Sequence, residues 1–210
     1  MLIFGLKRNT YTLSMAILKV EKLTCYRYPY YVFKGVEFTL QSGQSLALVG
    51  KNGIGKTSLL RILAGLAAPE AGSIIFNSTR AYLGHQHGLN LMFTPLENLM
   101  YTQTLFGIKS GLKSNKSLLL DVGLSHRSLY RSCHYLSQGQ SRRLGIALLM
   151  IKKAKLWILD EPFTALDTVG KALFNQIIDD HLKQNGMCVM ATHNMKHRCN
   201  QSFDLSIYAN

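Results

Sequence analysis

Two polar segments of this chain, residues 50–57 and residues 160–161, carry residues suited to phosphate chemistry. Residues 50–57 read Gly-Lys-Asn-Gly-Ile-Gly-Lys-Thr and match the phosphate-binding pattern G-x-x-x-x-G-K-[ST] at every fixed position. Gly50, Gly53 and Gly55 let the backbone bend so that consecutive amides point at phosphate oxygens, and the following helix adds its N-terminal dipole. The first segment therefore predicts a nucleotide-phosphate site, with contacts expected along Gly50, Lys51, Asn52, Gly53, Ile54, Gly55, Lys56, Thr57 and Ser58.

The side chains of both segments have distinct expected roles. Lys56 would place a cation near the β- and γ-phosphates, Thr57 would ligate Mg²⁺ through its hydroxyl, and Ser58 could contact the α-phosphate. In the second segment, Asp160 and Glu161 end an apolar strand. Charged side chains at the end of a buried strand are expected to have a functional role. Asp160 is expected to hold Mg²⁺ through its water shell. Glu161 is expected to orient and deprotonate the attacking water.

The elements that must position these residues alternate between strands and helices. Residues 45–49 predict a buried strand that feeds the loop, and 156–159 and 187–191 predict further buried strands. The apolar residues that follow the loop lie on one face of a predicted helix, and Gly65 can end that helix. The apolar periodicity of residues 169–182 predicts a long amphipathic helix. This alternation predicts an α/β fold with a mostly parallel sheet.

The remaining segments predict smaller structures. Residues 17–23 and 36–40 read as outer strands, and 73–76 and 81–83 as short strands. The region of about 88–140 lacks strand patterning and is expected to form a small helical subdomain. Its first helix has a clear start, since Thr94 can cap it, Pro95 suits the first helical position and Glu97 can reach back to the cap amide.

Length and composition indicate one globular domain with a full core. The chain has 210 residues, of which 47% are apolar and 17% charged. No apolar run approaches the roughly 18 to 20 residues needed to span a bilayer, so another chain would supply any membrane-spanning part. The cysteines form no C-x-x-C pair, which favours a reducing compartment over a disulfide framework or a zinc or haem site.

The net charge of +13 leaves two interpretations open. Between Tyr101 and Leu159 there are ten Lys or Arg residues and one acid, Asp121. Such a stretch could bind nucleic acid or an anionic membrane surface, or it could be a solvated basic face.

Residues 1–16 read as an N-terminal extension. They weakly resemble an organelle transit peptide, or they are an irregular extension ahead of a second start at Met15.

A third segment gives the chain a family resemblance. Leu136-Ser-Gln-Gly-Gln140 precedes the strand and acids at 156–162 and resembles the signature of the ATP-binding-cassette (ABC) ATPases, with Gln138 where a small residue is usual. The resemblance implies a P-loop cassette with an antiparallel N-terminal β subdomain. It also implies an ATP-dependent homodimer, in which Ser137, Gly139 and Gln140 contact the nucleotide bound to the partner copy.

The same resemblance extends to four further positions. Gln86 corresponds to the Q-loop, which senses Mg²⁺ and water, and Asp167 to the D-loop that joins the two sites. His193 corresponds to the histidine that hydrogen-bonds the γ-phosphate. The slot for the adenine-stacking aromatic falls on Arg27, whose guanidinium could stack, although a shift of one residue would supply a tyrosine.

Within the family, Leu60–Leu66, Tyr82–Gln86 and Leu96–Leu99 look like the haem-exporter, cytochrome c maturation type. This resemblance implies a domain over 17–210 that hydrolyses ATP with Mg²⁺ and powers haem export or haem-chaperone release. Expected partners are permease subunits and cytochrome c assembly proteins, on the cytoplasmic face of a bacterial inner membrane or the matrix face of the mitochondrial one. The alternatives are a transporter for another substrate, or a soluble ABC ATPase acting on nucleic acid or ribosomes.

Overall fold

Two sheets form the framework of the computed structural model, which describes residues 17–84, 88–192 and 199–209. In the smaller sheet, the central strand β1 (Ile17–Arg27) pairs antiparallel with β2 (Tyr30–Gln41) and with β4 (Ala71–Ile75). This confirms the antiparallel β subdomain. Strand β1 runs further than the expected 17–23 because its last residues pair with β2 up to Arg27 and Tyr30.

The larger sheet is entirely parallel among its five described strands, as predicted. Its strand order is β5-β6-β7-β3-β8. Because the strands are parallel, their carboxyl ends meet at one edge, which is where ligands bind in open α/β sheets. The strands are β5 (Arg80–Leu83), β6 (Leu156–Asp160), β7 (Met187–Ala191), β3 (Ser45–Val49) and β8 (Gln201–Asp204).

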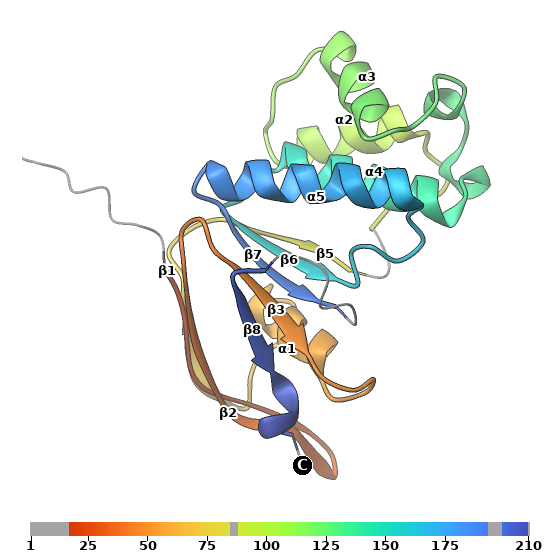
Figure 1. Ribbon diagram of the computed structural model, residues 1–210. Coiled ribbons are helices and arrows are strands. Elements are labelled where there is room, and N and C mark those ends of the chain that lie inside the picture. Colours follow the sequence, from red (N-terminus) through yellow and green to blue (C-terminus); the bar gives the residue numbers. More distant parts are fainter. Residues whose placement is uncertain (1–16, 85–87, 193–198, 210) are drawn as a thin grey trace, which may run out of the picture.

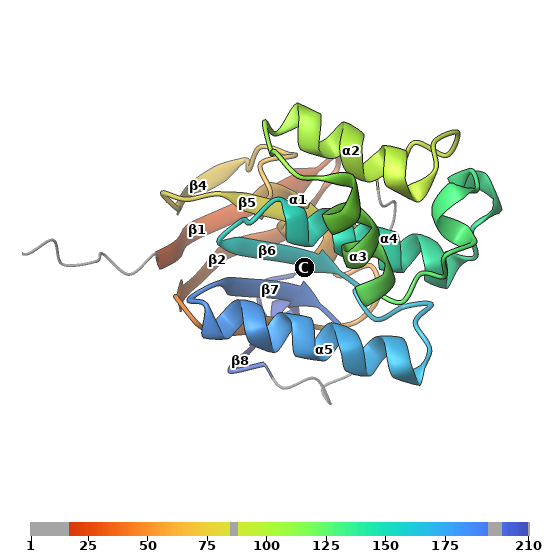
Figure 2. The ribbon, with the colours of Figure 1, turned by 90° about the horizontal axis from the view of Figure 1, so that it is seen from above.

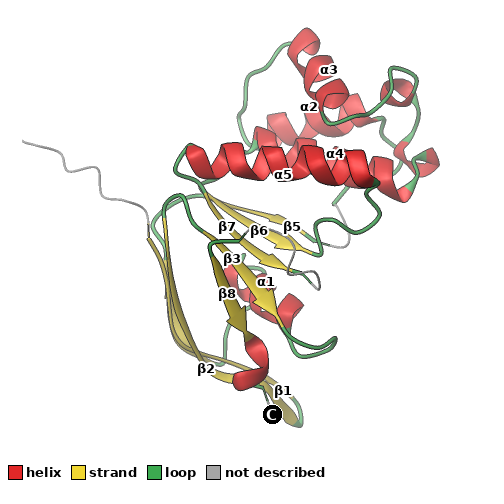
Figure 3. Cartoon of the chain, in the orientation of Figure 1, coloured by secondary structure: helices red, strands yellow, loops and turns green. Residues whose placement is uncertain are grey.

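Helices cover both faces of the parallel sheet (Figures 1 and 3). Helix α1 (Lys56–Leu63) lies between the two sheets, and α4 (Gln138–Ile151) and α5 (Thr168–Lys183) cover the opposite face. Alternate side chains of β6 therefore enter different cores. Leu156 and Ile158 join the core around α1, whereas Trp157 and Leu159 join the core beneath the other helices. This double burial explains why strand β6 is continuously apolar.

The helices α2 (Pro95–Leu105) and α3 (Leu112–Asp121) lie on the side of α4 that faces away from the parallel sheet (Figure 1), so that α3 lies in front of α4 in the view from above (Figure 2). They are followed by two short 3-10 helices, Ser128–Tyr130 and Cys133–Tyr135; a third, Leu205–Ile207, follows β8. The buried amides of Gln103 and Asn115 exchange hydrogen bonds of 2.8 and 2.9 Å and so join α2 to α3. In the described part of the chain, no helix is both long enough and apolar enough to cross a membrane.

Two predicted helix ends are confirmed. At the start of α2, the Thr94 hydroxyl accepts from the Glu97 amide at 3.2 Å and the Glu97 carboxylate accepts from the Thr94 amide at 2.7 Å, with Pro95 in the first helical position. At the end of α1, Gly65 adopts φ +75° and its amide donates to the Ile62 carbonyl at 3.0 Å. Both ends follow local sequence rules.

Candidate nucleotide site

The glycine loop lies between β3 and α1, at the carboxyl edge of the parallel sheet. Gly50, Gly53 and Gly55 all have positive φ angles, of 136°, 79° and 112°. Gly55 has a second reason to be glycine, since a Cβ there would lie 2.5 Å from Cγ1 of Val32 on strand β2. The loop backbone therefore depends on glycine both for its conformation and for its packing against the smaller sheet.

The Lys56 ammonium is folded into this loop. Its side chain is buried and Nζ donates to the carbonyls of Gly50, at 2.7 Å, and Lys51, at 3.0 Å. These carbonyls supply partial negative charge but no counter-ion. A buried lysine with this surrounding is suited to an anionic ligand next to the loop.

The two acids lie at the carboxyl end of strand β6, where Asp160 is the last residue of the strand and Glu161 follows it. Asp160 is buried, and its Oδ2 accepts hydrogen bonds from Thr57 Oγ1 at 2.9 Å and from Tyr82 Oη at 3.4 Å. Glu161 has a left-handed backbone with φ 48°, a conformation that costs roughly 1–3 kcal/mol in a residue other than glycine. The surrounding structure holds it through the Glu161 amide, which donates to Ala191, and through its carbonyl, which accepts from the Thr164 amide.

These groups line one open pocket of about 550 Å³. It brings together nine of the predicted site residues, from β1, the loop, α1 and the end of β6. Arg27 is among them, and no tyrosine of the described residues lines the pocket; which residue stacks on the base stays a prediction. Gly50, Lys51 and Ile54 belong to the loop but do not line the pocket. The full lining is Arg27, Asn52, Gly53, Gly55, Lys56, Thr57, Ser58, Asp160, Glu161 and Thr164.

The predicted signature residues lie outside this pocket. Ser137 is the N-cap of α4, where its hydroxyl accepts from the Gln140 amide at 3.2 Å and the Gln140 side chain accepts from the Ser137 amide at 2.9 Å. Gly139 packs so closely that a Cβ would lie 2.8 Å from the Ala165 carbonyl. Their contact with a nucleotide bound to a partner copy stays a prediction.

Asp167 also lies outside the pocket, at the N-cap of α5. Its carboxylate accepts from the Gly170 amide at 2.8 Å and from Arg143 Nη2 at 2.7 Å. The Gly170 amide and the Arg143 charge both lower the pKa of Asp167. The predicted residues Gln86 and His193 lie outside the described residues, and their roles stay predictions.

Sequence reasoning missed two residues at this edge of the sheet. The Tyr82 hydroxyl reaches Asp160 from strand β5. Burial, together with the Asp160 charge, raises the pKa of Tyr82 to about 12. The phenol is therefore protonated at neutral pH and donates a hydrogen bond to Asp160. Arg142 is buried in α4 and donates to main-chain carbonyls beside the pocket. The only signal in the sequence was an arginine on an otherwise apolar face of that helix.

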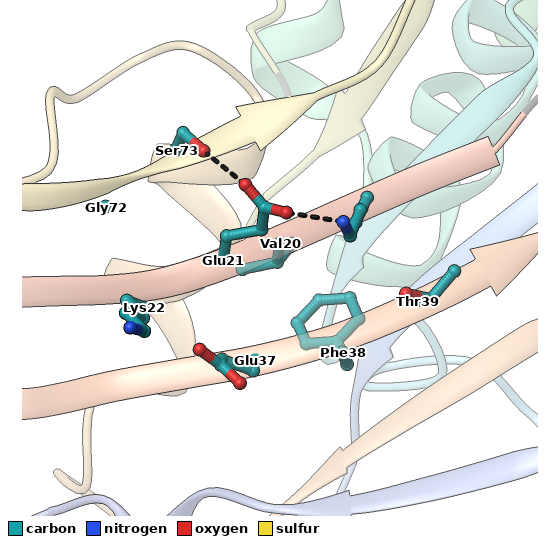
Figure 4. Close-up of a pocket in the computed structure, with 9 residues that line it drawn as sticks. Val20, Glu21, Lys22, Glu37, Phe38, Thr39, Gly72 and Ser73 are labelled. Carbon is teal, nitrogen blue, oxygen red and sulfur yellow. Dashed lines mark hydrogen bonds and ion pairs between the residues drawn. The ribbon is translucent and has the colours of Figure 1, made fainter.

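A second hollow, of about 650 Å³, lies on the smaller sheet (Figure 4). Two of its charges are paired within the sheet, because Glu21 forms an ion pair with Lys19 and accepts from the Ser73 hydroxyl at 3.2 Å. The hollow has no glycine loop and none of the predicted site residues. The chemistry expected from the sequence therefore belongs to the pocket at the glycine loop.

The donors at the loop suit a magnesium nucleotide. Mg²⁺ prefers oxygen ligands and keeps several waters, so one hydroxyl and one carboxylate, together with phosphate oxygens, are a fitting set. Thr57 and Asp160 supply these two oxygens side by side. The described residues contain no group of three or more His, Cys, Asp or Glu side chains that could hold a metal ion by themselves.

A parallel sheet with a glycine loop after β3 and acids at the carboxyl end of β6 defines the class of P-loop nucleotide-binding proteins. Residues 33–164 match the sequence profile described as ABC transporter. The chain belongs to the ABC transporter family, as an ATP-binding subunit.

Curated relatives cover most of the chain. It is 42% identical over 189 residues to the cytochrome c biogenesis ATP-binding export protein CcmA of Dechloromonas aromatica, a match that covers 84% of this chain and 92% of that protein. It is 40% identical over 185 residues to the protein of the same name from Rhodopseudomonas palustris, covering 81% and 88%. A solved ATP-binding subunit of an ABC transporter superposes with a TM-score of 0.80 at 23% identity, over 90% of this chain and 85% of that one, and so shares its fold.

Proposed function

We propose that this chain is the ATP-hydrolysing subunit of an ABC transporter complex that powers haem export or haem-chaperone release in cytochrome c maturation. The observation that carries the proposal is its similarity to cytochrome c biogenesis ATP-binding export proteins along about nine-tenths of their length. The pocket at the glycine loop supports the ATPase chemistry. The relatives' name supports the assignment to cytochrome c biogenesis, whereas haem as the cargo is implied by the family resemblance of residues 60–66, 82–86 and 96–99.

The loop and α1 would bind the triphosphate. Backbone amides of residues 50–58 would donate to the phosphate oxygens, and the Lys56 ammonium would exchange its carbonyl partners for phosphate oxygens. Arg27 would lie beside the base. Thr57 and Asp160 would hold Mg²⁺, which when bound neutralises charge on the β- and γ-phosphates.

Hydrolysis would depend on Glu161 as the general base, which orients a water in line with the γ-phosphate and accepts its proton. Gln86 and His193 would complete the arrangement around the water and the γ-phosphate. Ser137, Gly139 and Gln140 of a second copy would close the pocket, with Asp167 joining the two sites. ATP would therefore hold two copies together, and hydrolysis would release them.

The complex would lie on the inner membrane through permease subunits, on the cytoplasmic face of a bacterium or the matrix face of a mitochondrion. The helices α2 and α3 would transmit closure of the dimer to those subunits, as a domain-closure switch. Direct nucleic-acid binding has no part in this mechanism.

The test is an affinity pull-down of the Glu161→Gln protein from native membranes with ATP and Mg²⁺, with partners identified by mass spectrometry. Recovery of small membrane subunits together with cytochrome c assembly proteins is expected. A Lys56→Ala protein handled in parallel should recover less of any partner whose binding depends on nucleotide. An unrelated permease would keep the ATPase chemistry and overturn the cargo. Ribosomal proteins or DNA-binding factors alone would overturn the transporter function.

A further inference from the structure

One buried guanidinium joins segments that are far apart in the sequence. Arg142, in the second turn of α4, is only 3% exposed. Its Nη1 donates to the Gly84 carbonyl at 3.1 Å, and its Nη2 donates to the Glu161 carbonyl at 3.3 Å. Gly84 immediately precedes the segment that contains Gln86. A single side chain therefore connects helix α4, the end of β5 and the residue proposed as the base.

Stability does not explain this arginine. A buried charge loses its hydration, and apolar residues of similar volume often serve a core equally well or better. Arg142 also has a buried Nε donor with no hydrogen-bond partner among the described residues. Burial lowers the pKa of Arg142, and the carboxylates of Asp160 and Glu161 act in the opposite direction. The residue is thus better explained by what it holds than by packing.

What Arg142 holds is the backbone of Glu161. The carbonyl of Glu161 accepts from Arg142 on one side and from the Thr164 amide on the other. Glu161 has a left-handed backbone, which persists only where its surroundings fix it. Since the side chain of Glu161 lines the pocket, the orientation of this peptide group decides where its carboxylate lies.

The other end of the connection is the start of α4. Arg142 lies two residues after Gln140, within the turns stabilised by the Ser137 and Gln140 capping box. A planar guanidinium can donate to two separate carbonyls at once, whereas a lysine ammonium is a compact charge that holds such a pair less well. Movement of the start of α4 would therefore reach Glu161 through a rigid fork.

We propose that Arg142 is a positioning residue that couples the start of α4 to Glu161, so that engagement of Ser137 by a second copy sets the base for hydrolysis. The inference rests on the proposed function, since it takes Glu161 as the base. It differs from that function in predicting that ATP binding and hydrolysis separate when Arg142 is changed.

The experiment compares Arg142→Ala and Arg142→Lys with the wild-type chain, using MgATP. We expect kcat to fall roughly 10- to 100-fold in Arg142→Ala, because small misplacements of a reacting group have effects of this size. The ATP dissociation constant should change by less than about twofold, the pattern of a group that acts only in the transition state. The kcat of Arg142→Lys should lie between the values of the wild-type chain and of Arg142→Ala. Arg80→Ala is the matched control, because Arg80 also donates to a main-chain carbonyl, Leu63 at 2.7 Å.

Millimolar guanidinium ion gives a readout that a merely structural role would not move. It should raise kcat in Arg142→Ala and leave Arg80→Ala unchanged, whereas sodium chloride at equal ionic strength should do neither. If Arg142→Ala does not fold, Arg142→Lys must itself show reduced kcat with retained ATP affinity. Wild-type kcat in a folded Arg142 variant, or equal loss of ATP affinity and kcat, would overturn the proposal. Wild-type hydrolysis by Glu161→Gln would instead overturn the proposed base, which separates the two failures.

Discussion

At the scale of single residues, the pocket is organised before any ligand arrives. Lys56 is held by two loop carbonyls, and Thr57 is hydrogen-bonded to Asp160. Preformed donors and acceptors lose little freedom when a ligand binds, so each side chain should have a measurable effect of its own.

Lys56→Ala should weaken ATP binding by about tenfold or more, a change of at least ~1.4 kcal/mol. The reason is that the substitution removes the one cation inside the loop among the residues that line the pocket. Isothermal titration with MgATP would measure the dissociation constant. Lys171→Ala, an exposed lysine on α5, is the control for net charge. Unchanged ATP affinity in Lys56→Ala would remove Lys56 from the site.

His181 should make stability depend on pH. It stacks on Trp157 with ring centroids 3.8 Å apart, and burial lowers the pKa of His181 below its ordinary 6.5. The unfolded chain therefore binds the proton more tightly, so the stability from neutral His181 is complete above the unfolded pKa and is lost as pH falls from about 6.5 through the lower folded pKa.

His181→Phe should accordingly flatten the fall in unfolding free energy between about pH 7.5 and pH 5.5. The phenyl ring can keep the stack on Trp157 but does not titrate. Urea unfolding at several pH values would measure this, followed by the fluorescence of Trp157, the single tryptophan of the chain. Equal pH slopes in the two proteins would show that His181 does not titrate on unfolding in this range.

At the scale of elements, local rules decide where helices begin, and packing decides which face they bury. The capping box of α2 uses four consecutive residues and needs no distant contact. Helix α1 has a loop as its start, and its apolar residues are buried between the two sheets. Substitutions in a helix cap and in a buried helix face should therefore lower the free energy of unfolding by different amounts.

Thr94→Ala should lower the free energy of unfolding by about 1 kcal/mol, because the Glu97 amide loses its capping acceptor. Thr94→Ser keeps a capping hydroxyl and should be close to neutral. Thr104→Ala, an exposed threonine of the same helix, should change stability by less than about 0.5 kcal/mol. Urea denaturation of the three variants measures the effect. A Thr94→Ala protein as stable as Thr104→Ala would contradict the capping role.

At the scale of the whole molecule, the residues predicted to form the site do not all line one pocket in a single copy. The pocket contains the loop and the acids, whereas Ser137 and Gly139 do not line it. Two copies that exchange these surfaces would enclose two nucleotides, which is an isologous arrangement with two-fold symmetry.

Glu161→Gln should accumulate as a dimer with ATP and Mg²⁺, because binding remains while hydrolysis is blocked. Light scattering would report a doubling of mass over the same protein without nucleotide. The double variant Lys56→Ala, Glu161→Gln should stay monomeric under these conditions. A Glu161→Gln protein that remains a monomer at saturating ATP would contradict the sandwich arrangement.

Several features were determined by the sequence itself, because the physics behind them is local. The positive φ angles of Gly50, Gly53 and Gly55 depend on neighbours within a few residues. The same is true of the Thr94 cap. The family resemblance added site residues that no local physical rule indicates, from the order of the motifs along the chain. Gln86 and His193 were reached in that way alone.

Only the tertiary structure decided which distant residues share a surface. It placed Arg27, from β1, in the same pocket as the loop. It brought Tyr82 to Asp160 and Arg142 to the carbonyls of Gly84 and Glu161. These contacts depend on strand order and on how α4 packs over the sheet, which no local pattern contains. Hydrogen bonds across a sheet are settled only when all its strands are in place.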